Sequence, residues 1–404
     1  MSNLLPTLRF NKYTSSWSAS SMCELAEVDK STLPKSTPLD WAFNYISLSD
    51  IKNQVIKPEL SLFTVENAPS RARRKLKEGD ILLSTVRPNL QGFAKVGKSH
   101  KDCIASTGFA VLSPKDGVSS DFLFYYLFSP RLTYQLDSLV VGSNYPAINS
   151  SDVKELKLNF PCLKEQQKIA SFLTSIDTKV NQLTEKHRLL KDYKKGVMQQ
   201  VFSQKIRFKD DDGNDFPNWN EYALRDILIL QSDALKMDDE ATYELITVKR
   251  GFGGVKSRGH FKGKDVLVKN QFTIHKGEFV ISKRQIVHGA CGLVPEELDG
   301  AIVSNEYNVF RPQSTKLDID YFNRLSTTLY MRRAFFINSD GVHIEKLLFK
   351  TQSWLKTKVQ LPCLKEQQKI AQFLEALDKK TNAVNEQIEQ TKLFKKGLLQ
   401  QMFV

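Results

Sequence analysis

Apolar residues recur three or four positions apart along two long stretches of the chain, whereas elsewhere they form short runs bounded by Gly, Pro and charged residues. The first stripe comprises Leu173, Ile176, Val180, Leu183, His187, Leu190 and Val197, with Lys194 as its one break. The second stripe comprises Leu374, Leu377, Val384, Ile388, Phe394 and Leu398. Alternating steps of three and four place side chains along one seam, as in a coiled coil, so each stripe predicts a long helix.

The two predicted helices, which we call the arms, are copies of each other. Residues 161–202 and 362–403 are identical at 23 of 42 positions without gaps, at a constant offset of 201. Pro161 and Pro362 end the preceding segments, and Glu165 and Glu366 then fall in the first helical turn, where the helix dipole favours a carboxylate. A straight helix from residue 165 to 202 would be about 57 Å long, enough to hold two domains a fixed distance apart.

Each arm contains a glycine, Gly196 or Gly397, late in its sequence. Glycine inside a helix costs about 1 kcal/mol relative to alanine, so its presence in both copies predicts close helix approach or a shared bend. Two interpretations of the apolar stripe stay open. Each arm could be buried within its own domain, or the two arms could pack on each other in antiparallel fashion and leave other faces for outside partners.

The segments before the arms differ from each other but share sparse landmarks. Each opens with Arg-Phe and then Trp, at Arg9, Phe10 and Trp17 and again at Arg207, Phe208 and Trp219. The strand pattern of residues 78–84 parallels that of residues 276–282, and a helical stretch and a final apolar strand follow in both segments. We therefore predict two mixed domains of related architecture.

The predicted order is a domain over residues 1–160, an arm over 161–204, a second domain over 205–361 and a second arm over 362–404. The fold class is α+β: two mixed α/β domains joined by two long antiparallel coiled-coil helices. If Leu8 lies near Phe403, as Ile206 lies near Phe202, the chain has pseudo-two-fold symmetry.

Charge indicates the kind of partner. The chain has 58 Lys and Arg against 45 Asp and Glu, a net charge of +13. This balance favours a polyanionic partner such as nucleic acid, although a basic surface without such a partner is the alternative. The apolar run at residues 122–128 is far too short to span a membrane. Five dispersed cysteines without C-x-x-C pairs are typical of reduced thiols, so we expect a cytoplasmic protein without a metal site.

Basic and polar loops at matching places in the two domains predict DNA contacts. Lys and Arg neutralise phosphates, and Arg, Asn and Gln bond base edges. The candidate contacts are Arg71, Arg73, Arg87, Asn89, Lys95, Ser143, Asn144 and Tyr145 in the first domain and Lys249, Arg250, Lys283, Arg284, Gln285, His288 and His343 in the second. Each cluster alone could also be an ordinary solvated surface.

One segment fits a catalytic motif literally. Residues 92–99 match G-x-x-x-x-G-K-[ST], the P-loop pattern, in which Lys98 would contact phosphates and Ser99 would bind magnesium. No amphipathic helix follows Lys98, and the second domain lacks the pattern, so a basic hairpin is the favoured interpretation. A P-loop NTPase acting on nucleic acid is the alternative function, and a coiled-coil scaffold that binds acidic proteins is a third. No catalytic residues are predicted.

Pro-x-x-x-Glu-Gln-Gln-Lys-Ile-Ala-x-Phe-Leu and Lys-Lys-Gly-x-x-Gln-Gln-x-Phe each occur twice, together with the Arg-Phe and Trp openings. In these features the chain resembles the specificity subunit of type I restriction-modification systems over almost its whole length. The resemblance implies two target recognition domains, each recognising one half of a split site in double-stranded DNA. It implies helices that set the gap and dock two modification subunits, with two restriction subunits also in the complex.

The resemblance also implies that this chain carries no cofactor. S-adenosylmethionine, ATP and Mg²⁺ are expected on the partner subunits, which methylate adenine, translocate and cleave. We expect contacts of the arms with each other or with these subunits at Glu165, Gln166, Ile169, Phe172, Leu173, Ile176, Leu183, Gly196 and Gln200 and at Glu366, Gln367, Ile370, Phe373, Leu374, Leu377, Gly397 and Gln401.

Overall fold

The computed structural model describes residues 5–141, 146–343 and 347–404. It divides into two compact units, and each unit takes a part of both arms. The first unit comprises Met1–Glu185 and Asn385–Val404, and the second comprises Lys186–Val384. Each domain therefore associates with the beginning of the arm that follows it and with the end of the other arm.

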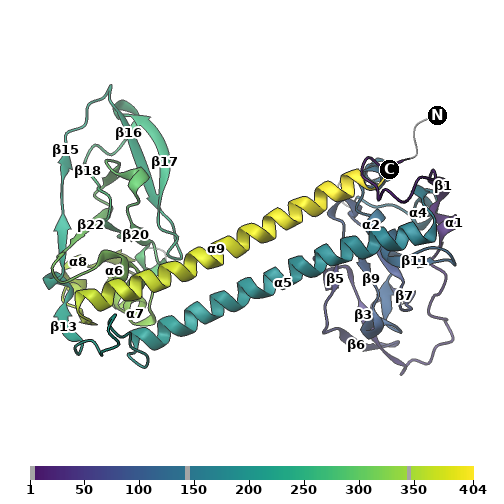
Figure 1. The fold of residues 1–404 in the computed structure, drawn as a ribbon, viewed down its shortest axis with the longest axis horizontal. Coiled ribbons are helices and arrows are strands. Elements are labelled where there is room, and N and C mark those ends of the chain that lie inside the picture. Colours follow the sequence, from purple (N-terminus) through teal and green to yellow (C-terminus); the bar gives the residue numbers. More distant parts are fainter. Residues whose placement is uncertain (1–4, 142–145, 344–346) are drawn as a thin grey trace. The chain divides into compact units, whose positions relative to one another are not determined.

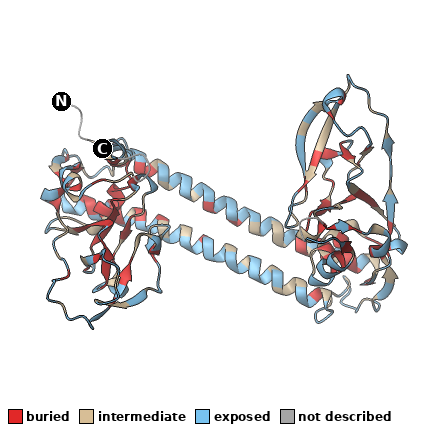
Figure 2. Cartoon of the chain, turned by 180° about the vertical axis from the view of Figure 1, so that it is seen from behind, coloured by how far each residue is buried: buried red, intermediate tan, exposed pale blue. Residues whose placement is uncertain are grey.

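Both arms are single helices, as the apolar stripes predict. α5 spans Leu163–Phe202 and α9 spans Leu364–Gln401, 40 and 38 residues long (Figure 1). At 1.5 Å per residue, each measures about 60 Å along its axis. Burial is concentrated in the domains and at the helix ends, while much of each helix surface between is exposed (Figure 2).

The described residues of the first unit form three main sheets and four short α-helices besides the arms. Its strands are β1 Ser18–Ser21, β2 Ala26–Val28, β3 Ala42–Ile46, β4 Ile51–Lys52, β5 Val55–Ile56, β6 Ser61–Thr64, β7 Ala72–Lys75, β8 Ile81–Ser84, β9 Ala94–Lys95, β10 Ile104–Ser106, β11 Phe109–Pro114 and β12 Lys157–Phe160. Its helices are α1 Met22–Leu25, α2 Ser120–Tyr126, α3 Pro130–Leu139 and α4 Ser150–Glu155. The strand orders of these sheets are β1-β12, β2-β11-β8-β9 and β6-β3-β10-β7. A small β4-β5 hairpin forms a fourth, two-stranded sheet.

The second unit repeats this framework. Its strands are β13 Asn220–Ala223, β14 Leu228–Gln231, β15 Ala234–Leu235, β16 Thr242–Val248, β17 Val255–Lys262, β18 Gln271–Thr273, β19 Phe279–Ser282, β20 Cys291–Leu293, β21 Ile302–Ser304, β22 Tyr307–Pro312, β23 Ser339–Asp340, β24 Leu348–Phe349 and β25 Lys358–Leu361. Its helices are α6 Ile319–Ser326, α7 Leu329–Ile337 and α8 Thr351–Trp354. The sheet orders are β13-β25, β14-β22-β19-β20, β15-β18-β21-β16-β17 and β23-β24.

The pairing pattern identifies the shared part and the differing part of the two domains. β10 runs parallel to β3 and antiparallel to β7, and β21 runs parallel to β16 and antiparallel to β18. The third sheet differs at its edges, because β6 extends one side in the first unit whereas β17 and β15 extend both sides in the second. A common framework thus carries different peripheral strands and loops.

The apolar stripes of the arms are largely buried inside the units. In the first unit, Leu173 of α5, Leu398 of α9 and Phe403, which follows α9, belong to the same core as the aromatic helix α2. In the second unit, Val201 of α5 and Leu374 of α9 join the core around α6. Both interpretations of the stripe are therefore partly correct: each arm end packs on a domain, and within each unit it also shares a core with the other arm.

In each unit, the opening of the domain is hydrogen-bonded to the end of an arm. The Leu8 N–H donates to the Gln401 carbonyl at 2.9 Å, and the Ile206 N–H donates to the Gln200 carbonyl at 3.3 Å. Because position 401 is position 200 plus the repeat offset of 201, the two hydrogen bonds are equivalent. The condition stated for pseudo-two-fold symmetry, that Leu8 lies near the end of the second arm, is met.

Each arm begins at a carboxylate that binds the opening of its own domain. Glu165 accepts hydrogen bonds from Arg9 Nε and Nη2, both at 2.7 Å, and from Trp17 Nε1 at 3.4 Å. Glu366 accepts equivalent bonds from Arg207, at 3.3 and 2.7 Å, and from Trp219 Nε1 at 3.2 Å. Such two-point pairing is strong and directional. In the first unit, the hydrogen bond between Arg9 and Glu165 is the main cause of the raised pKa of Arg9.

The glutamine after each anchoring glutamate fixes the other side of the junction. Gln166 accepts from the Ser119 N–H at 2.8 Å and donates to the Pro161 carbonyl at 2.9 Å. Gln367 accepts from the Asp318 N–H at 2.9 Å and donates to the Pro362 carbonyl at 2.9 Å. Ser119 and Asp318 are the N-caps of α2 and α6, so each glutamine ties the arm to the first turn of the neighbouring helix.

Adjacent glutamines of the second arm allow a direct test of this junction. Gln367 is 0% exposed, and Gln368 is exposed. We expect Gln367→Ala to lower the free energy of unfolding by about 1–3 kcal/mol, because backbone groups of Asp318 and Pro362 lose their buried partner. Gln368→Ala, the matched control, should change it by less than about 0.5 kcal/mol. Guanidinium chloride unfolding measures both, and equal losses would contradict the assigned role.

Candidate nucleic-acid interface and arm surface

The residues predicted for the arm contacts divide by burial. The buried ones are Glu165, Gln166, Ile169, Leu173, Ile176, Leu183, Glu366, Gln367, Ile370 and Leu374. Phe172, Phe373, Leu377, Gly196 and Gly397 are half-buried, and Gln200 and Gln401 are exposed. Apart from Leu183, the buried set lies in the cores and junctions of the units, and the burial of all these side chains leaves no surface for an outside subunit. The apolar stripe joins the arms to the domains.

Equivalent ion pairs explain the polar break in the stripe. Lys395 binds Asp177 in the first unit at 2.6 Å, and Lys194 binds Asp378 in the second. Asp177 also accepts from the Tyr125 hydroxyl at 2.8 Å, and Asp378 also binds Arg324. Sequence reasoning missed these pairs. The available signal was that both Asp and both Lys occupy matching positions in the two arms.

The glycines of the arms have no steric explanation within the chain. A Cβ added at Gly196 or Gly397 would meet nothing within 4 Å. Of the two predicted roles, close helix approach or a shared bend, the described residues show no close approach at either position. Neither glycine interrupts its helix.

Each glycine instead belongs to an exposed helical face. Tyr193 lies three residues before Gly196 and Gln200 four residues after it, which places all three on one side of α5. Phe394, Gly397 and Gln401 repeat this arrangement on α9. Tyr193 is 53% exposed and Phe394 is 55% exposed. We call each triplet an arm face.

In the first unit, the turn that carries Arg87 and Asn89 is hydrogen-bonded to residues 146–148. Arg87 and Asn89 are exposed in the turn after β8, and Arg87 has a left-handed φ of 49°. The Arg87 N–H donates to the Pro146 carbonyl at 2.7 Å, and the Ile148 N–H donates to the Thr85 carbonyl at 2.9 Å. This turn therefore contacts the segment before the arm. The candidates Ser143, Asn144 and Tyr145 lie outside the described residues.

The remaining candidates of the first unit lie along strand edges. Arg71 precedes β7 and Arg73 lies within it, and both side chains are exposed. Lys95 in β9 forms an ion pair with Asp121, so part of its charge is neutralised within the chain. Arg71 and Arg73 are better placed for phosphate contacts than Lys95.

In the second unit, the segments that carry the two predicted clusters are hydrogen-bonded to each other. Lys249 and Arg250 are exposed in the β16–β17 loop, and Gln285 and His288 lie in the turn after β19. The loop and the turn are joined by hydrogen bonds from the Gly251 N–H to the His288 carbonyl at 2.7 Å and from the Phe252 N–H to the Gly289 carbonyl at 2.8 Å. Sequence reasoning placed both clusters but did not predict their contact.

Other candidates of the second unit have different surroundings. Arg284 pairs with Glu306 at 2.6 Å, and this hydrogen bond is the main cause that raises the pKa of the guanidinium. Lys283 is fixed through its backbone, which donates to Glu306 and accepts from Phe349, both at 3.0 Å. His343 is exposed.

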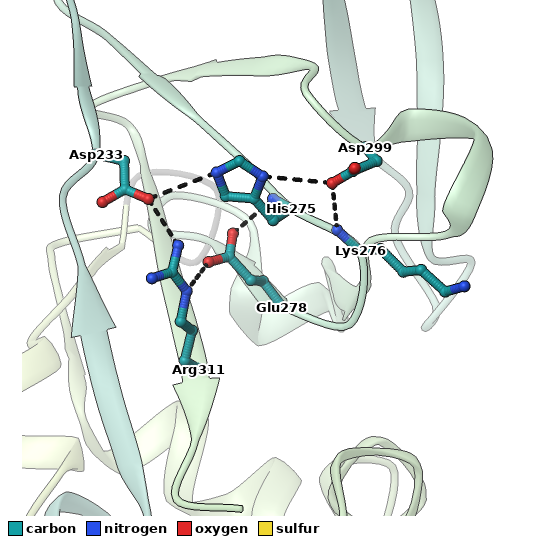
Figure 3. Close-up of polar contacts among 6 residues, drawn as sticks. All are labelled: Asp233, His275, Lys276, Glu278, Asp299 and Arg311. Atoms are coloured by element: carbon teal, nitrogen blue, oxygen red, sulfur yellow. Dashed lines mark hydrogen bonds and ion pairs between the residues drawn. The ribbon is translucent and has the colours of Figure 1, made fainter.

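A polar network holds the turn that leads into β19 (Figure 3). Glu278 is 2% exposed and accepts from the His275 N–H at 2.7 Å and from Arg311 Nε at 2.6 Å. Arg311 also binds Asp233 at 2.7 Å, and the His275 ring lies between Asp233 and Asp299, at 3.6 and 3.4 Å (Figure 3). The strand that carries the predicted DNA-contact turn is thereby fixed at its start.

The first unit uses a simpler form of this turn. Asp80 accepts from the Lys77 N–H at 2.8 Å and from the Ser113 hydroxyl at 2.7 Å. Burial raises the pKa of Asp80. The carboxylates of the Gly-Asp sequence before β8 and of the Gly-Glu sequence before β19 thus close equivalent turns and stabilise the framework.

The network gives a testable difference between two cations. We expect Arg311→Met to lower the free energy of unfolding by about 1–3 kcal/mol, because the buried Glu278 carboxylate loses its counter-ion while the arginine itself is partly solvated. Lys276→Met removes a pair with Glu296 whose side chains are 59% and 80% exposed, so it should cost less than about 1 kcal/mol. Adding Glu278→Gln to Arg311→Met should recover part of the loss. Thermal unfolding at pH 7 checks all three variants.

The segment that matches the P-loop pattern does not have the P-loop fold. Residues 94–95 form β9, and Lys98 begins a three-residue 3₁₀ helix over Lys98–His100 that is followed by β10. A P-loop would place a longer helix there, with its N-terminus on the phosphates. The structure gives no support to the NTPase alternative.

Within the described parts of the chain, no group of three or more His, Cys, Asp or Glu side chains is arranged to hold a metal ion. The same residues contain no helix that is long and apolar enough to cross a membrane. Burial raises the pKa of the Cys291 thiol to about 12, which disfavours its reactive thiolate.

Solved structures with the same fold include two crystal structures. One is the HsdS subunit from Thermoanaerobacter tengcongensis, with 19% identity, a TM-score of 0.53 and 95% coverage of both chains. Another is the type I restriction-modification S subunit from M. genitalium, with 15% identity, a TM-score of 0.57 and 99% coverage of both chains. A chain from a structural study of assembly and conformational transition in the type I system has a TM-score of 0.61, with 19% identity and 95% and 96% coverage.

Sequence comparisons agree with the fold. The chain is 24% identical over 341 residues to the MjaVIII specificity subunit of Methanocaldococcus jannaschii, which covers 80% of this chain and 78% of that protein. It is 28% identical over 162 residues to the HindI specificity subunit of Haemophilus influenzae, 39% of this chain and 35% of that protein. The model of the type I restriction modification DNA specificity domain matches residues 14–191 and 218–391. The chain therefore belongs to the family of type I restriction-modification specificity subunits, with two DNA specificity domains.

Proposed function

We propose that each unit of this specificity subunit recognises one half of a split DNA site, and that the arms fix the gap between the halves and dock two modification subunits. The observation that carries the proposal is the combination of equivalent arm junctions with unlike loops. The Glu165 and Glu366 anchors are the same, whereas the basic loops around Arg87 and Lys249 differ in sequence and conformation. Equal junctions favour two copies of one partner, and unlike loops favour two different half-sites.

The charge of the chain supports a DNA partner. A net charge of +13 favours association with a polyanion. Phosphate contacts from exposed side chains such as Arg71 and Lys249 would supply salt-dependent affinity, and a smaller number of base contacts would choose the sequence. Linking two recognition domains makes the second contact intramolecular, so two modest half-site affinities give one tight and specific interaction.

In this proposal the chain itself is not catalytic. S-adenosylmethionine, ATP and Mg²⁺ would bind to the modification and restriction subunits, two of each, and the assembled complex would act in the cytoplasm. Adenine methylation requires a base that is flipped out of the duplex at a reproducible place. The role of this chain would be to supply that placement.

A domain exchange tests half-site recognition. We expect replacement of residues 18–160 by the matching domain of another specificity subunit to change one half of the methylated motif and to leave the other half intact. This boundary keeps Arg9, Trp17 and the Glu165 anchor, so the junction with the arm is preserved. Genome-wide mapping of methylated adenine after co-expression with the modification subunit gives the motif. A change in both halves, or in neither, would contradict modular recognition.

The arm faces predict the stoichiometry of docking. Tyr193→Asp combined with Phe394→Asp should abolish binding of the modification subunit, because exposed aromatic side chains are frequent centres of binding energy in protein interfaces. Tyr193→Asp alone should reduce the number of bound copies from two to one. Analytical ultracentrifugation of the co-expressed complex measures this number.

The control for the arm faces uses neighbouring glutamines. Gln199 and Gln400 are exposed but lie about 100° around the helix from Gln200 and Gln401. Gln199→Asp with Gln400→Asp should leave two copies bound, and circular dichroism should show unchanged helix content in every variant. Loss of docking in the control as well would show that charge on any side of the arms disrupts assembly, and the assignment of the faces would fail.

A further inference from the structure

The β16–β17 loop of the second unit has a sequence that does not favour one conformation. Three of the six residues from Lys249 to Gly254 are glycines. Gly251, Phe252 and Gly254 all have positive φ, at 67°, 59° and 73°. Glycine adopts this region freely, but for a bulky residue such as Phe252 it is strained. The surrounding structure must therefore hold the loop in place.

Backbone hydrogen bonds supply the first restraint. Gly251 and Phe252 donate to the carbonyls of His288 and Gly289, at 2.7 and 2.8 Å, and the Lys249 N–H closes the loop on the Gly254 carbonyl at 2.9 Å. The loop is thus bonded to the turn after β19, which carries other candidate DNA contacts. Hydrogen bonds of this kind order a loop only while the two segments stay packed together.

The Phe252 ring supplies the second restraint. A Cβ added at Gly289 would lie 2.7 Å from the ring, so the absence of a side chain at Gly289 makes room for it. Gly292 likewise accommodates Gly254, since its Cβ would lie 2.8 Å from the Gly254 Cα. The ring also packs against the core of the second unit. The absence of side chains at Gly289 and Gly292 therefore allows the loop to pack against the β19–β20 segment.

A cation covers the ring. The Arg332 guanidinium carbon of α7 lies 4.6 Å from the centre of the Phe252 ring, within the range of a cation–π interaction. Arg332 Nε donates to the Thr327 carbonyl at 3.0 Å, which orients the guanidinium. Phe252 thus lies between helix α7 and the turn after β19 and joins both to the loop.

The first unit orders the turn that matches the turn after β19 by other means. There the turn after β8 contains left-handed Arg87 and Gln91, and Gln91 Nε2 donates to the Thr133 hydroxyl of α3 at 3.3 Å. The connection that matches the β16–β17 loop, residues 47–60 between β3 and β6, contains no aromatic residue. Any effect of Phe252 should therefore be confined to one unit.

From these contacts we propose that Phe252 is the positioning residue for DNA recognition by the second unit: it locks the Lys249–Gly254 loop beside the Gln285–Gly289 turn. This inference rests on the proposed function. Phe252 acts through its neighbours, because its ring is held between Gly289 and Arg332, while exposed Lys249 and Arg250 face the solvent. A preformed loop binds DNA without the entropic cost of ordering on contact.

The test compares Phe252→Ala and Phe252→Tyr with the unchanged chain, each in the complex with its modification subunit. Binding is measured to duplexes with the full split site, with only the first half altered, and with only the second half altered. The domain exchange assigns each half to its unit. We expect Phe252→Ala to reduce discrimination at the second half by about tenfold or more, which corresponds to about 1.4 kcal/mol, and to leave discrimination at the first half within about twofold. Phe252→Tyr should retain it.

A second measurement separates positioning from direct contact. In the Phe252→Ala complex without DNA, hydrogen exchange should be faster at the backbone amides of residues 251 and 252. Protection in the β14-β22-β19-β20 sheet should be unchanged. Loss of discrimination without faster exchange would mean that the ring itself contacts DNA, and the positioning role would be refuted. If the sheet also loses protection, Phe252→Leu, which keeps an apolar side chain of similar reach, replaces Ala and is judged by the same two measurements.

The results that would refute the role of Phe252 differ from those that would refute the proposed function. Equal loss at both halves, or no loss at either half with an intact complex, would overturn the role of Phe252 while DNA recognition stands. An unchanged complex that does not prefer any split site would instead refute the proposed function.

Discussion

The buried carboxylate at the start of each arm is the constraint on which the architecture depends. Glu165 and Glu366 are 1% and 0% exposed, and each must be neutralised where it lies. The arginine that neutralises it and the tryptophan that donates a hydrogen bond to it come from the opening of the domain, about 150 residues earlier in the chain. A single polar cluster therefore joins the first and last parts of a domain and sets the direction in which the helix leaves it. The neighbouring glutamine adds α2 or α6 to the same junction, so the arm and the domain form one cooperative unit.

The fold could be predicted well where the sequence repeats or alternates. The apolar stripes predicted α5 and α9, and the matching landmarks before them predicted two domains of one architecture. The role of Glu165, Gln166 and their counterparts could not be predicted, because a carboxylate in a first helical turn is equally consistent with a dipole interaction at the surface. The pairs of Lys194 with Asp378 and of Lys395 with Asp177 were hidden for a similar reason, since their partners lie on different arms.

The candidate DNA contacts were predictable as chemistry and less so as geometry. The basic loop with Lys249 and the turn with His288 can be recognised in the sequence. The contact between these two segments depends on Gly289 and Gly292, and the role of these glycines is visible only in the tertiary structure. Arg284 looked like a base-reading residue and proves to be paired with Glu306. The glycines of the arms show the reverse case. A helix glycine suggests a close neighbour, but in the described residues no neighbour lies within 4 Å of a Cβ added at either glycine. Charge and spacing identify which residues can act, whereas the partners of each charge come from the tertiary structure.

The discontinuous composition of the first unit has a consequence for biosynthesis. Residues 385–404 complete this unit, and Phe403 packs against Phe122 and Tyr126 of α2 at ring distances of 5.3 and 5.2 Å. At ribosomal rates of 5–20 residues per second, the roughly 200 residues between the two parts take about 10–40 seconds to emerge. During this interval the nascent first domain lacks the last turns of α9 and exposes part of its aromatic core. The second unit, although it is encoded later, has its whole sequence available first, so the N-terminal domain is the last to become complete.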